Sequence, residues 1–154
     1  MGYTIKIGHA AETAPLQFEV HGEHHEDAPT FPNDEMTGNT NERSPSYTAW
    51  RNFCRETGLE EMFYDVSEGL LRRHPGVVPL TQEHLASIKE ARERWQAKAT
   101  LPPGFDGWPM PRPDGTWGAP DEGKYDYQLA RLLWLEWWVE WAIENAGRPA
   151  IENW

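Results

Sequence analysis

The chain has one cysteine among its 154 residues, Cys54, and this scarcity limits the chemistry that it can support. A single thiol forms no disulfide within the chain and builds no thiolate metal cluster. A reducing compartment fits best. The first residues also lack the basic and apolar regions of a secretory signal. The sequence therefore predicts a protein of the cytoplasm.

Basic residues are scarce as well. Lys and Arg number 14 against 25 Asp and Glu, which gives a net charge of -11. Contacts to phosphates depend on basic side chains that displace counterions, so we expect no direct binding to nucleic acid or to an anionic membrane. The same charge favours the basic surface of another protein as a partner.

Long apolar runs are missing, since no uninterrupted stretch approaches the roughly 18 residues of a membrane span. We therefore expect no membrane segment. The hydrophobic fraction is only 38%, but the chain contains nine Trp, five Tyr and five Phe. Because aromatic side chains bury large areas, we expect an aromatic core.

These signals predict a mainly helical (α+β) single domain over residues 1–154, with an N-terminal β-hairpin packed on a bundle of three to four helices. The alternation of Ile5 and Ile7, and of Leu16, Phe18 and Val20, predicts the hairpin. The predicted segments are a hairpin (1–20), a polar loop (21–44), helices (45–100), a Pro/Gly loop without regular strands (101–123) and a Trp-rich central helix (124–146).

Helix boundaries are predicted by capping residues. Ser44 before Pro45 indicates a helix start, Gly58 its end, and Thr81 the N-cap of the next helix. The last helix, at about 125–145, is apolar around most of its circumference, which is typical of a central helix or of one shared with a second subunit. Three glutamates, Glu136, Glu140 and Glu144, follow one another at intervals of four along this helix. They favour a solvated stripe over a catalytic or metal-binding group.

A dense polar stretch precedes the first predicted helix. Gly38 allows a tight turn there, and helix N-terminal amides can hold an anion or a carbonyl oxygen. The stretch is a candidate site for a small polar ligand, although local hydrogen bonds to its own backbone would explain the same composition. The candidate ligand-binding residues are Asp34, Glu35, Asn39, Asn41, Arg43 and Ser44.

The segment HGEHHED offers a candidate zinc or iron site at His21, His24 and His25. Its spacing matches no specific zinc motif, and a polar surface loop would explain it equally. We expect no other cofactor. Trp108 and Trp117, which lie among prolines, are candidate anchors for a protein partner, because tryptophan is enriched at interface hot spots. The alternative for both is packing onto the domain itself.

Four stretches carry a resemblance to known proteins: FPNDEMTGN, NERSPSYTAWRNFCRETGL, RRHPG and YDYQLARLLWLEWWVEWAIENAGRPAIENW. Together they resemble a group of small uncharacterised proteins of tailed bacteriophages and prophages. The resemblance spans most of the chain. It implies a phage origin and the cytoplasm of a bacterial host, and it assigns no catalytic residue.

The sequence as a whole favours a non-enzymatic, acidic phage accessory protein that acts by binding another protein, for example by masking a basic surface of a host factor. A small enzyme or ligand-binding protein with its site at residues 34–44 is an alternative. So is a metal-dependent hydrolase built on the three histidines. A homo-oligomeric or virion component, with subunits joined through the last helix, is the remaining alternative.

Overall fold

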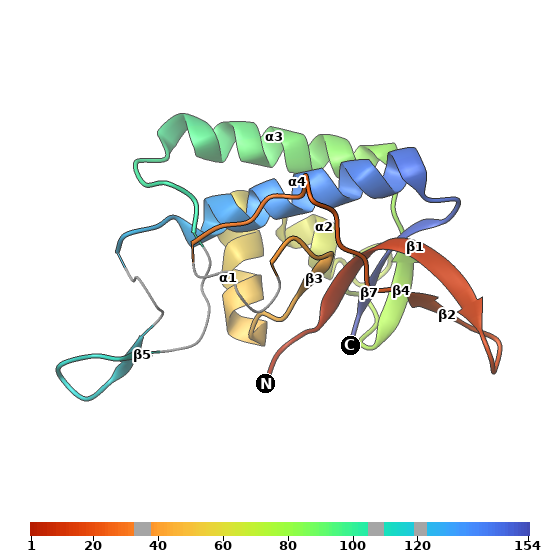
Figure 1. Ribbon diagram of the computed structural model, residues 1–154, viewed down its shortest axis with the longest axis horizontal. Coiled ribbons are helices and arrows are strands. Elements are labelled where there is room, and N and C mark those ends of the chain that lie inside the picture. Colours follow the sequence, from red (N-terminus) through yellow and green to blue (C-terminus); the bar gives the residue numbers. More distant parts are fainter. Residues whose placement is uncertain (33–37, 105–109, 119–122) are drawn as a thin grey trace.

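The computed structural model describes residues 1–32, 38–104, 110–118 and 123–154. Within these ranges the chain forms four helices, a five-stranded antiparallel sheet and a small separate hairpin (Figure 1). The helices are α1 (Tyr47–Thr57), α2 (Glu60–Tyr64), α3 (Gln82–Lys98) and α4 (Tyr127–Asn145). The strands are β1 (Ile5–Thr13), β2 (Gln17–Val20), β3 (Glu42–Arg43), β4 (Gly76–Pro79), β5 (Met110–Pro111), β6 (Trp117–Gly118) and β7 (Pro149–Asn153).

The prediction of a mainly helical fold is wrong, because the five-stranded curled antiparallel sheet makes this an α+β structure. The N-terminal hairpin, β1 with β2, is confirmed, but it is only part of the sheet. β3 has only two residues. β4 follows one proline and ends with another, and β7 begins with a proline. Such short strands show no alternation in the sequence, and pairing with distant segments stabilises them.

The sheet has the strand order β2-β1-β7-β4, and β3 pairs with β1 beside β2. β7 therefore lies between β1 and β4, with Ile7 opposite Ile151 and Val78 opposite the same residue. Ile5, Ile7, Val78 and Ile151 are buried in the main core, so this face of the sheet packs against the helices. The other face carries only a small apolar cluster around Ala10, Val20 and Ala150.

Capping residues set the helix ends. The N-cap of α1 is Ser46 rather than Ser44, and its Oγ accepts a hydrogen bond from the Ala49 amide at 3.1 Å. Gly58 ends α1 in the left-handed conformation (φ 79°), as predicted. The prediction that Thr81 caps α3 is also confirmed, with His84 closing a reciprocal capping box.

The core is aromatic, as predicted, with Trp50, Phe53, Phe63, Trp134 and Trp138 all fully buried. α4 is the central helix. It lies side by side with the antiparallel α3 and passes over the sheet, where it packs on β1 and β7 (Figure 1). This packing within one chain covers most of the apolar circumference of α4. In the described ranges no helix is long and apolar enough to cross a membrane.

The Pro/Gly loop contains a regular hairpin despite its prolines. β5 and β6 pair antiparallel, with Met110 opposite Gly118, and the Arg112 amide donates to the Thr116 carbonyl at 2.6 Å. Gly115 has a positive φ of 86° in the turn. The expectation that proline would exclude strands fails because a two-residue pairing needs few amides. The hairpin projects from the body of the molecule beyond α1 (Figure 1).

Candidate functional site

Asn41 is the most strongly bonded of the candidate ligand-binding residues. Its side chain is fully buried and donates from Nδ2 to the carbonyl oxygens of Ile7 (3.0 Å) and His21 (2.8 Å). Its Oδ1 accepts from the Glu23 amide at 2.9 Å. These three bonds join β1 to the segment after β2 and to the residue before β3, so the amide group closes the gap between the two short strands beside β1. All three bonds run to backbone groups of the protein itself, but to residues 18, 20 and 34 positions away rather than to the local backbone that the alternative interpretation names.

The other described candidate residues of this stretch do not converge with Asn41. Arg43 is buried, with its guanidinium 5.1 Å from the centre of the Trp134 ring, and Ser44 is exposed. Asn39 is half-buried and its carbonyl accepts from the His25 amide at 3.1 Å. Asp34 and Glu35 lie outside the described residues. The ligand site therefore stays a prediction, and the described side chains assemble no pocket for it.

The three candidate metal ligands lie in different surroundings. His21 and His24 are exposed, whereas the ring of His25 lies 5.2 Å from that of Trp137 and 6.5 Å from that of Trp141 on α4. Across the described ranges, no three His, Cys, Asp or Glu side chains are arranged to hold a metal ion. The packing of His25 on α4 fixes the acidic loop against the helix instead.

Trp117 is 67% exposed on β6, at the projecting hairpin. Arg112 Nη1 donates to the Trp117 carbonyl at 2.8 Å, which stabilises the backbone of the hairpin that carries the indole. Trp108 lies outside the described residues. An exposed tryptophan on a projecting hairpin is compatible with the predicted role as a partner anchor.

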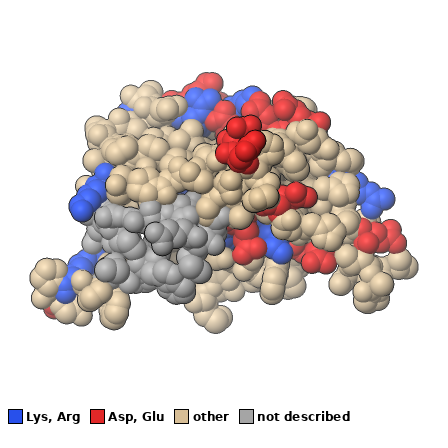
Figure 2. Space-filling model, viewed as in Figure 1, with Lys and Arg blue, Asp and Glu red and all other residues tan. Residues whose placement is uncertain are grey.

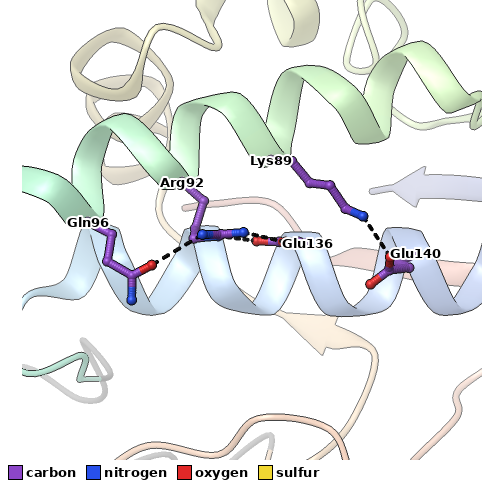
Figure 3. Close-up of polar contacts among 5 residues, drawn as sticks. All are labelled: Lys89, Arg92, Gln96, Glu136 and Glu140. Atoms are coloured by element: carbon purple, nitrogen blue, oxygen red, sulfur yellow. Dashed lines mark hydrogen bonds and ion pairs between the residues drawn. The ribbon is translucent and has the colours of Figure 1, made fainter.

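The carboxylates of α4 are paired across the helix interface (Figure 3). Arg92 of α3 forms a two-point contact with Glu136, through Nη2 (2.9 Å) and Nε (2.5 Å), and Lys89 Nζ donates to Glu140 at 2.7 Å. The hydrogen bond to Glu136 raises the pKa of Arg92, and that to Glu140 raises the pKa of Lys89. Glu144 is exposed. Two of the three glutamates therefore fix α3 against α4 rather than forming a solvated stripe.

A second polar arrangement joins α1, the segment before β4, and β7. Asn153 is fully buried and donates from Nδ2 to the Arg73 carbonyl (2.9 Å), so its Oδ1 faces His74 Nδ1 at 2.6 Å. This oxygen can only accept, which places the proton on Nδ1 and leaves Nε2 of a neutral imidazole to accept from the Tyr47 hydroxyl at 3.1 Å.

This tyrosine-imidazole pair could exchange a proton, but it lies outside the hollow that the structure shows. That hollow, of about 480 Å³, lies between α1 and α3. Its lining residues are Glu56, Thr57, Ala91, Arg94, Trp95, Ala97 and Lys98. Because His74 is exposed on the surface and both of its ring nitrogens are already hydrogen-bonded, we assign the pair a structural role in joining α1 to the sheet.

Sequence reasoning missed the uneven distribution of charge. Residues 7–42 contain eight of the 25 carboxylates and none of the 14 Lys and Arg side chains, so this quarter of the chain carries -8 of the net charge of -11. A count of charge along the chain would have found it. The described part of this segment forms the β1–β2 hairpin and the loop that runs over α4 (Figure 1).

We call five described carboxylates of this segment the acidic strip: Glu12, Glu19, Glu23, Glu26 and Asp27. Four are exposed and Glu19 is half-buried, and in the described ranges none of the five forms an ion pair with Lys or Arg. Figure 2 shows acidic side chains spread over the half of this face that carries the sheet, with few basic ones between them. Uncompensated charge of one sign on neighbouring elements can attract a cationic partner.

Comparisons of the chain with protein-family models, with curated proteins and with solved structures find no match.

Proposed function

We propose that the protein is a binding module that uses the acidic strip to attach to a basic surface of another protein. The observation that carries this proposal is the concentration, on the β1–β2 hairpin and the following loop, of mostly exposed carboxylates that have no Lys or Arg partner in the described ranges. Carboxylates elsewhere, such as Glu136 and Glu140, are already neutralised by α3. The strip is thus the part of the described surface most suited to electrostatic complementarity.

The resemblance to phage proteins favours a partner in an infected bacterium, with the cytoplasm of the host as the place of action. By covering a basic surface, the protein would compete with whatever anionic ligand that surface normally binds, including nucleic acid. The exposed Trp117 belongs to the β5–β6 hairpin, which lies at the opposite end of the molecule from the β1–β2 hairpin (Figure 1). In this proposal it is therefore an aromatic anchor separate from the acidic strip.

The test compares two variants of equal net charge. One neutralises the strip (Glu12, Glu23 and Glu26 to Gln, Asp27 to Asn), and the matched control neutralises four exposed glutamates elsewhere (Glu61, Glu68, Glu93 and Glu144 to Gln). Both are immobilised beside the wild type and used to capture proteins from an infected bacterial lysate at low and high salt.

We expect the wild type and the control to capture near-equal amounts of one partner, which high salt releases. The strip variant should capture at least about tenfold less of it. Equal losses on both variants would show that net charge alone drives capture, and unchanged capture by the strip variant would remove the strip from the interaction. Either result contradicts the proposed function.

A further inference from the structure

The two ends of the main sheet differ in how they are protected. β4, at one end, follows Pro75 and ends with Pro79. Proline lacks an amide, so it discourages the addition of another strand. β2, at the other end, contains neither proline nor lysine, and in the described ranges no strand pairs with its outer side. At the Val20 end this edge is occupied, because the Val20 amide donates to a carboxylate oxygen of Glu152 at 3.4 Å. The part of the edge that is open to a further strand lies at Phe18, nearer the turn.

The direction of the backbone groups on β2 follows from the pairing of β1. The Ala10 amide donates to the Arg148 carbonyl at 2.9 Å, on the side of β1 away from β2. Backbone groups alternate in direction along a strand, so Ala11 and its partner Glu19 face each other across the hairpin. The amide and carbonyl of Phe18 then point outward, toward the open side.

The side chains at this edge differ between the two faces. On one face Phe18 is 51% exposed, with the Arg148 guanidinium 5.2 Å from the centre of its ring, and the neighbouring Leu16 in the turn is 87% exposed. Glu19 lies on the opposite face, because successive residues alternate. An added strand would therefore meet an apolar group on one side and a carboxylate on the other.

We propose that the open edge of β2 binds an extended segment of a partner protein whose residues alternate between basic and apolar. The added strand takes its backbone hydrogen bonds from Phe18, places apolar side chains beside the Phe18 ring and points Lys or Arg toward Glu19. Strand addition of this kind obtains affinity from the main chain and specificity from alternate side chains. The inference rests on the proposed function, because it names the form of the basic partner.

The test uses a defined probe, a dye-labelled ten-residue peptide that alternates Lys with Val, and measures its binding by fluorescence anisotropy. The matched control peptide has the same sequence with N-methyl groups on alternate residues, which removes donors on one edge while keeping the charge. On the protein side, Phe18→Ala removes the ring, and Phe18→Pro removes the ring and the outward amide; thermal unfolding checks that both variants fold.

We expect the N-methylated peptide to bind at least about tenfold more weakly, and Phe18→Pro to bind the unmodified peptide at least about fivefold more weakly than Phe18→Ala. In the wild type, hydrogen exchange of the Phe18 amide should slow about tenfold when the peptide is saturating, which tests the same contact if Phe18→Pro does not fold.

Two outcomes would overturn the inference. Equal binding of both peptides, with unchanged hydrogen exchange of the Phe18 amide, would show that the contact is purely electrostatic and not strand addition. The proposed function would still hold if, in the capture experiment, the strip variant alone lost its partner. Absence of peptide binding would overturn strand addition by this class of segment, while capture by the strip and control variants would still decide the proposed function separately.

Discussion

Replacing Asn41 by Asp tests whether the side-chain amide closes the gap beside β1. The substitution preserves shape and the acceptor for the Glu23 amide, but it removes both donors and turns a carboxylate oxygen toward the carbonyls of Ile7 and His21. Each buried acceptor that loses its donor costs about 1–3 kcal/mol. We expect Asn41→Asp to lower the free energy of unfolding by about 3–5 kcal/mol at pH 7, a large part of the roughly 5–15 kcal/mol typical of a domain.

The loss should depend on pH with a defined sign. The buried site disfavours the charged form, so the introduced carboxyl has a folded pKa above its unfolded value of about 3.9. The folded variant then holds a proton that the unfolded chain releases, and stability relative to wild type falls as pH rises from that unfolded value through the folded one. Below about pH 4 the protonated acid regains one donor and part of the loss disappears.

Urea unfolding of the wild type and the variant at pH 4 and pH 7, followed by tryptophan fluorescence, measures both effects. The control is Asn39→Asp, which makes the same change in charge at a half-buried residue two positions away. A loss below about 1 kcal/mol, or an equal loss at both pH values, would refute the role assigned to the Asn41 amide.

Four further predictions concern other parts of the fold. A double-mutant cycle on Arg92 and Glu136, whose side chains are 23% and 15% exposed, should give a coupling free energy of about 1–2 kcal/mol, and the cycle on the more exposed Lys89 and Glu140 should give a clearly smaller one. Equal couplings would contradict the geometry of Figure 3. Burial raises the pKa of the Cys54 thiol, so a disulfide reagent should modify the native protein only at the rate of unfolding, whereas fast labelling in native buffer would count against this packing. Burial also raises the pKa of Glu152, so Glu152→Gln should stabilise the protein more at pH 7 than at pH 4 in urea titrations, and the opposite order would place that carboxylate in a different environment. Trp117→Ala should change the free energy of unfolding by less than about 0.5 kcal/mol, and a larger loss in thermal unfolding would show that the indole packs on the domain.

Local signals predicted the helices and the first hairpin because their causes lie within a few residues. Thr81 and Gly58 act on their own helices, and the apolar circumference of α4 predicted its central position. β3, β4 and β7 could not be predicted in this way, because each is stabilised by pairing with residues far along the chain. Their absence from the sequence interpretation is what produced the incorrect helical fold.

The candidate sites show the same limit. The bonds of Asn41 depend on where β2 and β3 end beside β1, and the packing of His25 depends on the path of its loop over α4. Neither can be derived from composition, which is why both residues resembled ligands in the sequence. The acidic strip, by contrast, follows from the sequence alone once charge is counted by segment rather than over the whole chain.

The position of β7 determines when this protein can fold during its synthesis. β7 is an interior strand, and Thr4 and Trp154 exchange backbone hydrogen bonds of 2.6 and 3.0 Å at its end. A ribosome adding about 5–20 residues per second needs roughly 7–27 s to travel from the end of β1 at Thr13 to the start of β7 at Pro149. Throughout that interval Ile5 and Ile7 lack their partner strand, so the nascent chain presents an apolar segment that chaperones can recognise, and the sheet is completed only after β7 has been synthesised.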